Sequence, residues 1–168
     1  RKAVKAFNLP SIELQNYEAD DLIATYKIQA KKEKIKLTIV SSDKDLMQLV
    51  DQDTYMLDTM KDKHIGIDEV KEKFGVPPEK VIDVQSLAGD SVDNVPGVPG
   101  IGIKTAAELI NQFGSLDELL KKAETIKQPK RRQALLDNKS NALISRELVT
   151  LKNDVPVKET INDFILKP

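Results

Sequence analysis

Residues 36–50, KLTIVSSDKDLMQLV, determine how the rest of the chain is interpreted. Segment 36–41 is β-branched and ends in small polar residues, which predicts a buried strand. Asp43 and Asp45 follow where that strand would end, and a short helix is expected over 43–50. In parallel α/β sheets, ligands bind beyond the carboxyl ends of the strands. The pattern therefore places two carboxylates where a ligand would bind.

The flanking sequence continues an alternation of strands and helices. Further short strands are expected at 11–14 and 54–57. A helix is expected over 18–34, because apolar residues recur there at a spacing of three and four. This alternation predicts an α/β domain with a parallel sheet over residues 1–76.

A helix is expected at 67–74, and from residue 77 to 168 the pattern is helical throughout. Further helices are expected at 79–88, 104–113, 115–122, 129–138 and 142–151. Gly75 is expected to end the first of these, and Ser115 with Glu118 forms a capping box. No low-complexity linker separates the two parts, so a packed interface between domains 1–76 and 77–168 is expected.

Composition excludes several classes of protein. The 168 residues contain no cysteine and one histidine, His64, which excludes disulfides, Cys-based zinc sites and thiol nucleophiles and disfavours histidine-dependent triads. His64 itself is expected to be a solvated turn residue. No apolar run approaches the ~20 residues of a membrane span, and no signal peptide opens the chain. A protein of the cytoplasm with no membrane partner is therefore expected.

Charge is unevenly distributed, although the whole chain carries only −1. Residues 43–93 contain thirteen acids and six lysines, a balance of −7. Residues 121–152 contain nine bases and three acids, a balance of +6. The two stretches are either solvated surfaces of opposite sign or sites for cations and for phosphates.

Three groups of acidic residues lie where elements are expected to begin or end. They are Glu18, Asp20 and Asp21; Asp43 and Asp45; and Asp90 and Asp93. Each group alone fits an ordinary role at a helix N-terminus, an N-cap or a turn. If they converge, repulsion at about 4 Å costs ~1 kcal/mol in water and ~4 kcal/mol at an effective dielectric of about 20. Mg²⁺ or Mn²⁺ would offset it, and a pair of such ions suits phosphodiester cleavage.

Asp43 and Asp45 do not fit two familiar motifs that pair aspartates at this spacing. An EF-hand loop would need glycine where Gln48 stands and glutamate where Thr54 stands. A phosphoaspartyl hydrolase would carry Thr or Ser at the position of Met47. Neither a calcium loop nor a phosphoaspartyl site is therefore indicated.

A glycine-rich segment, PGVPGIGIKT at 96–105, precedes one of the expected helices. It lacks the glycine before Lys104 that a Walker A loop requires, and no strand precedes it as in a Rossmann fingerprint. Together with helices at 81–88 and 105–113 it forms a helix–hairpin–helix, which grips a nucleic acid backbone without reading sequence. The alternative is a tight turn between helices with no ligand.

Three motifs now point to one family: YEADD at 17–21, SDKDLMQL at 42–49 and AGDSVDNVPGVPGIGIKTA at 88–106. In order, spacing and context they resemble the 5′→3′ exonuclease domain of bacterial DNA polymerase I, among the structure-specific 5′ nucleases or flap endonucleases. The resemblance covers essentially the whole chain. It implies the C-terminal part of a PIN-like parallel-sheet nuclease core, followed by an all-helical, SAM-like domain with the helix–hairpin–helix.

The resemblance also implies roles for individual residues. The implied metal ligands are Glu18, Asp20, Asp21, Asp43, Asp45, Asp90 and Asp93, with Asp20, Asp21, Asp43 and Asp45 as the catalytic set. The implied potassium site uses the carbonyls of Leu87, Ala88, Pro96, Val98 and Ile101. The implied DNA-binding residues are Gly97, Gly100, Ile101, Gly102, Ile103, Lys104 and Thr105.

Members of this family begin with a strand carrying a further aspartate and a helical arch, and this chain starts after both. A truncated, weakly active fragment is therefore expected, a monomer near the nucleoid, without its polymerase domain. The implied function is metal-dependent hydrolysis of DNA at a 5′ flap, nick or 5′ end, in replication and repair. The alternatives are a non-catalytic, structure-specific DNA-binding module and a Mg²⁺-dependent phosphatase of small molecules.

Overall fold

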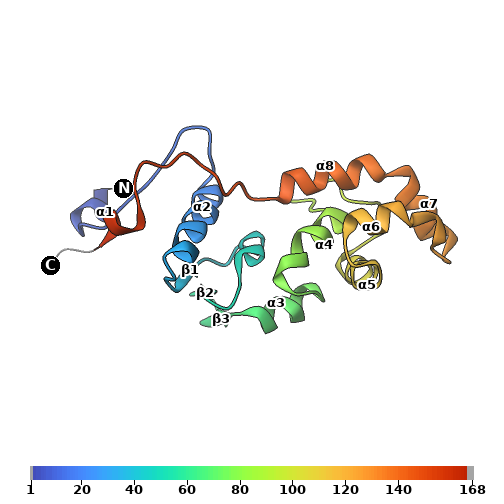
Figure 1. Cartoon of the computed structure of the whole chain (residues 1–168), viewed down its shortest axis with the longest axis horizontal. Coiled ribbons are helices and arrows are strands. Elements are labelled where there is room, and N and C mark those ends of the chain that lie inside the picture. Colours follow the sequence, from blue (N-terminus) through green and yellow to red (C-terminus); the bar gives the residue numbers. More distant parts are fainter. Residues whose placement is uncertain (1, 166–168) are drawn as a thin grey trace.

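The computed structural model describes residues 2–165, with Lys5 described by its backbone alone. The elements of the α/β part are α1 (Lys2–Ala6), α2 (Ala19–Lys32), β1 (Leu37–Val40), η1 (Asp45–Leu49), β2 (Thr54–Asp58), β3 (Lys63–Ile65) and α3 (Ile67–Phe74). Figure 1 shows them on one side of an elongated molecule, with the helices of residues 81–149 on the other side.

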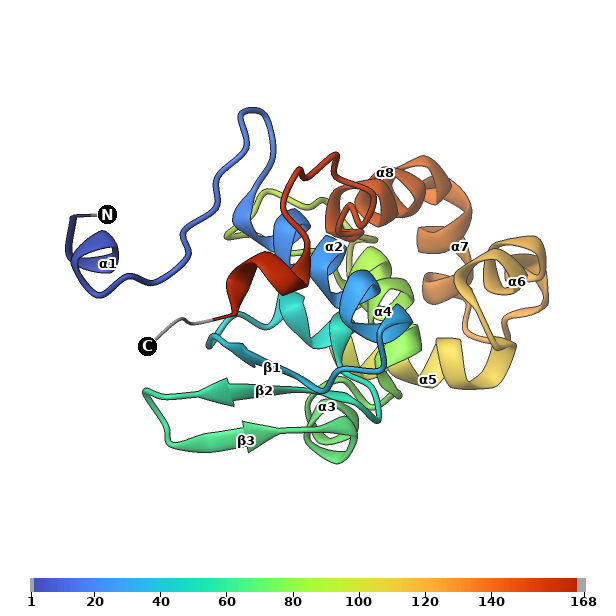
Figure 2. The same cartoon turned by 60° about the vertical axis from the view of Figure 1, so that its left-hand side comes forward.

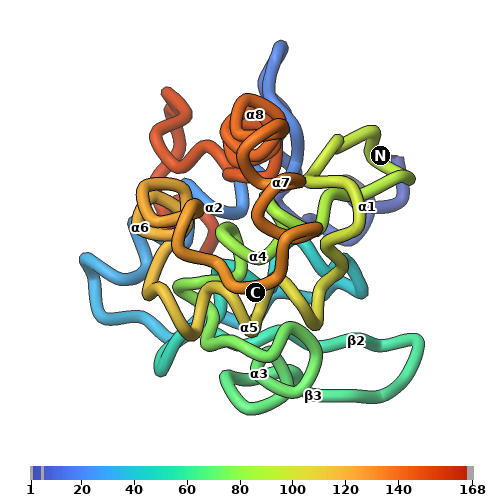
Figure 3. The backbone as a smooth tube through the Cα atoms, turned by 90° about the vertical axis from the view of Figure 1, so that its right-hand side faces the viewer, coloured from blue at the N-terminus to red at the C-terminus, as the bar shows by residue number. Residues whose placement is uncertain are grey.

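The sheet has three strands in the order β1-β2-β3. β1 runs parallel to β2, with Leu37 opposite Thr54, whereas β3 runs antiparallel to β2, with Met56 opposite Ile65. The expected all-parallel sheet is therefore wrong for its last strand. Residues 59–62 are too short a connection for a parallel crossover, so β2 and β3 form a hairpin that projects from the body (Figures 2 and 3).

The strand expected at 11–14 is also wrong. This segment runs outside the sheet, and no strand among residues 2–165 lies beside it to complete its backbone hydrogen bonds. His64 lies in β3 and stacks on Tyr55, with 5.4 Å between the ring centroids. It is exposed to solvent, as expected, but lies in a strand and not in a turn.

The second part is helical, as predicted. Its elements are η2 (Pro78–Lys80), α4 (Val81–Ala88), α5 (Ile103–Phe113), α6 (Leu116–Lys121), η3 (Ala123–Thr125), α7 (Pro129–Asp137), α8 (Lys139–Val149) and η4 (Ile161–Phe164). Gly75 ends α3 at φ +71°, and Ser115 Oγ caps α6 by accepting from the Glu118 N–H at 3.2 Å. Both local predictions are confirmed, as is the fold class.

One hydrophobic core runs through both parts. Buried apolar side chains form a continuous cluster from Ile39 and Met56 of the sheet, through Phe74 of α3, to Ile110 and Leu135 of the helical part. The packing fixes how the acidic loops of the first part face the hairpin of the second.

The chain returns to the α/β part after α8, along residues 150–164 (Figure 1). This return segment lies against α2, where the Lys152 N–H donates to Asp21 Oδ1 at 2.8 Å and the Val155 N–H donates to Thr25 Oγ1 at 3.1 Å. Phe164 packs edge-on against Tyr26, with ring centroids 5.1 Å apart. Residues 150–164 thus pack against α2 and connect the end of the helical part to the α/β part.

Among the described residues, no helix combines the length and the apolar character that crossing a bilayer requires.

Candidate functional site

The first acidic group lies at the start of α2. Asp20 and Asp21 occupy the first helical turn, where carboxylates complement the helix dipole. Asp21 is engaged structurally, since it accepts from the backbone N–H of Glu18 at 3.4 Å and of Lys152 at 2.8 Å. Asp20 is half-buried and lines a cavity described below.

The second group follows β1. The Asp43 N–H donates to Ser41 Oγ at 3.0 Å, and Asp43 Oδ1 accepts from the Asp45 N–H at 2.9 Å. This side-chain turn competes with regular helix hydrogen bonding. The helix expected over 43–50 is therefore a 3₁₀ helix, η1, that begins at Asp45.

The third group belongs to the loop between α4 and α5. Asp90 Oδ1 accepts from the Val92 N–H at 2.8 Å, and its Oδ2 pairs with the ammonium of Lys44. The Lys44 hydrogen bond lowers the pKa of Asp90 below its usual range. Asp90 is therefore a paired carboxylate, whereas Asp93 is exposed.

These loops meet at one cavity of about 360 Å³, the carboxylate pocket. It is lined by Glu18, Asp20, Asp43, Asp45, Asp93, Val95, Leu148, Val149 and Leu151. Five of the seven predicted acidic residues thus come together, and Asp21 and Asp90 do not line the pocket. Within residues 2–165, no three acidic or histidine side chains are gathered closely enough to enclose a single metal ion.

The electrostatics of the pocket reflect crowding of like charge. Burial raises the pKa of Asp20, and the charges of Asp43, Glu18, Asp45 and Asp21 raise it further. Burial also raises the pKa of Asp45, although a hydrogen bond from Gln85 opposes the shift. The pocket thus concentrates negative charge that the described residues do not fully neutralise.

Sequence reasoning missed two polar partners of this pocket. Lys44 joins the second acidic group to the third through Asp90, and Gln85 Nε2 of α4 donates to Asp45 Oδ1. Gln85 is 5% exposed, and its Oε1 has no hydrogen-bond partner among the described residues. The available signal was one glutamine in the apolar helix VIDVQSLA.

The glycine hairpin, residues 89–102, connects α4 to α5. Asp90 and Val95 exchange backbone hydrogen bonds of 2.9 and 2.7 Å. Gly89 and Gly97 have positive φ and touch, because a Cβ on Gly97 would lie 2.5 Å from the Gly89 nitrogen. The Gly97 N–H donates to Ser145 Oγ of α8 at 2.8 Å, which fixes Gly97 inside the hairpin.

Gly100 and Gly102 are different. A Cβ on either would meet nothing within 4 Å, so open space lies beside the backbone there. Gly100 has φ +79°, but Gly102 has φ −88°, a conformation that any residue adopts. Gly102 precedes α5, and Lys104 is exposed in its first turn.

Two of the predicted potassium carbonyls, Leu87 and Ala88, lie at the end of α4, and the other three lie in the hairpin. Leu87 O accepts from the Val98 N–H at 2.7 Å, and Val98 O accepts from the Ile101 N–H at 3.0 Å. Each carbonyl oxygen has a second lone pair. Cation binding by these carbonyls stays a prediction.

Comparison with known proteins gives the same assignment to both parts. A family model described as 5′-3′ exonuclease, N-terminal resolvase-like domain, matches residues 1–75. A second, 5′-3′ exonuclease, C-terminal SAM fold, matches residues 76–168.

Proteins of similar sequence support the same family. DNA polymerase I of Rhizobium leguminosarum is 57% identical over the whole chain, which spans 16% of that protein. A 5′-3′ exonuclease of Buchnera aphidicola is 36% identical over 98% of the chain, which spans 59% of that protein.

Solved structures show the same fold at low sequence identity. A T5 5′-exonuclease mutant matches with a TM-score of 0.82 at 22% identity, over 89% of this chain and 62% of that one. Bacteriophage T5 flap endonuclease with DNA and metal ions matches with a TM-score of 0.82 at 21% identity, over 90% and 56%. The two family models together account for every residue, and the chain belongs to the 5′-3′ exonuclease family.

Proposed function

We propose that this chain carries the active-site region of a metal-dependent 5′→3′ exonuclease and 5′-flap endonuclease that hydrolyses DNA during replication and repair. The observation that carries the proposal is the convergence of Glu18, Asp20, Asp43, Asp45 and Asp93 on one pocket. Three separate segments supply these residues. Membership of the 5′-3′ exonuclease family supports the same function.

The residues of the carboxylate pocket suit hard divalent cations. Their side-chain donors are carboxylate oxygens, which Mg²⁺ and Mn²⁺ prefer. Mg²⁺ keeps several waters and binds through one or two carboxylates plus substrate phosphates, so no single ion needs three protein ligands. Asp20 with Asp43, and Asp45 with Asp93, are the pairs that we propose as ligands. A bound cation would lower the pKa of the attacking water and polarise the phosphate.

The protein's own contribution is to place and prepare these carboxylates. Gln85 donates a hydrogen bond that orients Asp45, and Lys44 pairs with Asp90, which does not line the pocket. Burial and the repulsion from neighbouring carboxylates raise the pKa of Asp20, and an arriving cation would remove the repulsion. Leu148 and Val149 form an apolar wall beside the acids.

The glycine hairpin is proposed to hold duplex DNA next to this pocket. Open space beside Gly100 and Gly102 lets a phosphate approach the backbone, and the N-terminus of the eleven-residue α5 aims N–H groups at it. Lys104 adds a positive charge, and Ile103 is 41% exposed on the same turn. A potassium ion on the hairpin carbonyls would strengthen this phosphate contact.

The test is single-turnover cleavage of a 5′-flap duplex in Mn²⁺. We expect Asp45→Asn to slow cleavage at least ~10²-fold, as removal of one transition-state contact does in other hydrolases. Asp154→Asn is the matched control, because its carboxylate is exposed outside the pocket and makes only a 3.8 Å ion pair with Lys152. Its cleavage rate should equal that of the wild type.

Binding without cleavage would contradict the proposal. If the wild type binds the flap duplex in Mn²⁺ but leaves it intact, the chain is a non-catalytic DNA-binding module. A thermal shift keeps the metal site testable by itself: Mn²⁺ should raise the Tm of the wild type and of Asp154→Asn, and raise that of Asp45→Asn less.

A further inference from the structure

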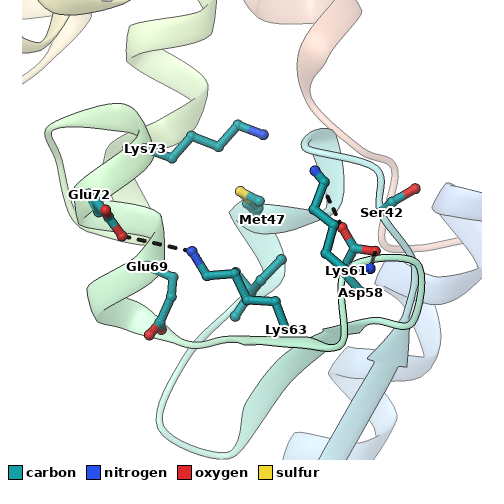
Figure 4. Close-up of a pocket in the computed structure, with 9 residues that line it drawn as sticks. Ser42, Met47, Asp58, Lys61, Lys63, Glu69, Glu72 and Lys73 are labelled. Carbon is teal, nitrogen blue, oxygen red and sulfur yellow. Dashed lines mark hydrogen bonds and ion pairs between the residues drawn. The ribbon is translucent and has the colours of Figure 1, made fainter.

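A second cavity, of about 350 Å³, lies between the β2–β3 hairpin and α3. It is lined by Ser42, Met47, Asp58, Lys61, Lys63, Ile65, Glu69, Glu72 and Lys73, and we call it the lysine pocket. Figure 4 shows Lys61 and Lys73 on opposite sides of Met47, with the ammonium of Lys73 directed across the opening. Neither the carboxylate pocket nor the glycine hairpin contains any of these residues.

Two of the three acids of the lysine pocket, Asp58 and Glu69, accept hydrogen bonds from the backbone. Asp58 is 2% exposed, and its Oδ1 accepts from the backbone N–H groups of Met60 and Lys61 at 3.0 and 3.2 Å, which fixes the hairpin turn. Glu69 Oε2 accepts from the Gly66 N–H at 2.8 Å at the start of α3. These two carboxylates serve local structure.

The lysines, in contrast, are loosely held. Lys61 Nζ lies 3.6 Å from Asp58 Oδ2, and Lys63 Nζ lies 3.8 Å from Glu72 Oε2. Both pairs are longer than a hydrogen bond and solvent-exposed on the lysine side, so they contribute little and can be exchanged for another anion.

Lys73 has no ion pair among the described residues. Burial lowers its pKa, and the positive charges of Lys61 and Lys44 lower it further, while Asp43 and Asp45 act in the opposite direction. An anion between Lys61 and Lys73 would remove the repulsion between them. The lining carries three lysines and three carboxylates, and Lys73 is the lysine without an ionic partner among the described residues.

The position of the lysine pocket relates it to the proposed active site. Ser42 and Met47 line this pocket, whereas Asp43 and Asp45 line the carboxylate pocket. The two cavities thus lie on opposite sides of one short segment, 42–47. Lys73 is close enough to Asp43 and Asp45 for their charges to act on it, so a polyanion that reaches the carboxylates has this ammonium beside it.

From this geometry we infer that the lysine pocket is a phosphate-binding site, with Lys61, Lys63 and Lys73 as its ligands, that holds a phosphate of the DNA strand beside the carboxylate pocket. The inference rests on the proposed function. Two sources share this chemistry, an internal phosphodiester and a terminal 5′ phosphate.

The first experiment uses inorganic phosphate alone. Titrated into the ¹⁵N-labelled chain at constant ionic strength, phosphate should shift the amide signals of residues 61–66 with saturation. Lys73→Ala should weaken this binding at least about fivefold, while Lys71→Ala should leave it unchanged. Lys71 is the matched control because it lies on α3, is exposed, and does not line the pocket. Non-saturating shifts, or equal binding by Lys73→Ala, would overturn the inference.

The second experiment measures duplex binding in EDTA, where no metal-dependent cleavage occurs. Lys73→Ala should weaken binding about three- to tenfold and reduce the salt slope by about one, with Lys71→Ala as control. If the effect is the same with a 5′-phosphate and a 5′-hydroxyl, the ligand is an internal phosphodiester; if it needs the 5′-phosphate, the ligand is terminal.

Equal losses in both lysine variants would overturn the inference and leave the proposed function standing. No duplex binding by the wild type would instead contradict the proposed function, and the phosphate titration would still decide the lysine pocket.

Discussion

The carboxylate pocket and the glycine hairpin adjoin each other but differ in how their groups interact. The pocket gathers charges that repel, so that burial and neighbouring carboxylates raise the pKa of Asp20. The hairpin satisfies its backbone, with paired hydrogen bonds between Asp90 and Val95 and a close contact between Gly89 and Gly97. The carboxylate pocket is destabilised by the repulsion between its side chains. The glycine hairpin is stabilised because Gly89 and Gly97 have no side chains and can touch.

This difference separates residues held for chemistry from residues held for structure. Removing a pocket carboxylate should stabilise the chain, because repulsion disappears. Adding one methyl group at the closed end of the hairpin should destabilise it. Four substitutions test this contrast.

The largest effect is expected at Gly97. Gly97→Ala places a Cβ 2.5 Å from the Gly89 nitrogen at φ +59°. The left-handed conformation costs about 1–2 kcal/mol and overpacking costs about 1–3 kcal/mol, so a loss of about 3 kcal/mol is expected in urea unfolding. Gly102→Ala is the control and should change stability by less than about 0.5 kcal/mol. Equal losses at both positions would show that the hairpin is uniformly sensitive.

Lys44→Met should destabilise next, by about 1 kcal/mol at neutral pH, since the ammonium is partly exposed. Lys44 lowers the pKa of Asp90, so the stability this pair supplies is present above the ordinary Asp pKa and is lost as pH falls through the lowered value. The difference between wild type and Lys44→Met should therefore vanish in acid. Lys71→Met, which removes an exposed 3.8 Å pair with Asp68, should show no such pH dependence.

Asp20→Asn should act in the opposite direction, raising stability by less than about 1 kcal/mol in metal-free buffer. Because the folded-state pKa of Asp20 is raised, the penalty is present above that pKa and is relieved as pH falls through it. Thermal unfolding against pH should show a gain at neutral pH and none in acid. A loss of stability at neutral pH would mean that Asp20 has a structural partner.

Gln85→Leu should change stability least. The substitution removes the hydrogen bond to Asp45 and also the buried, unpartnered Oε1, and these effects of about 1 kcal/mol oppose each other. The Gln85 hydrogen bond lowers the pKa of Asp45, so its loss should raise that pKa and move the acid limb of the pH–rate profile upward. An unchanged profile would make Gln85 a packing residue only.

How well the sequence predicted each element depended on whether its signal was local. Gly75, Gly114 and the Ser115 cap lie where expected, since a helix end depends on a few adjacent residues. The strand at 11–14 failed because a strand also needs a neighbour, which no local pattern encodes. The acids were predicted as a group because they stand at expected element ends, and five of the seven line one pocket. The structural roles of Asp21 and Asp90 depend on Lys152 and Lys44, which lie elsewhere in the chain.

The return segment determines when α2 can form its final contacts during synthesis of the chain. Its contacts with α2 join residues 131 and 130 positions apart, Asp21 with Lys152 and Thr25 with Val155. At about 5–20 residues per second, α2 waits roughly 6–26 s on the ribosome for these partners. Until then the buried Thr25 hydroxyl and the Asp21 carboxylate lack the backbone groups that pair with them in the folded chain. The α/β part therefore makes its final contacts only after the segment that follows α8 has been translated.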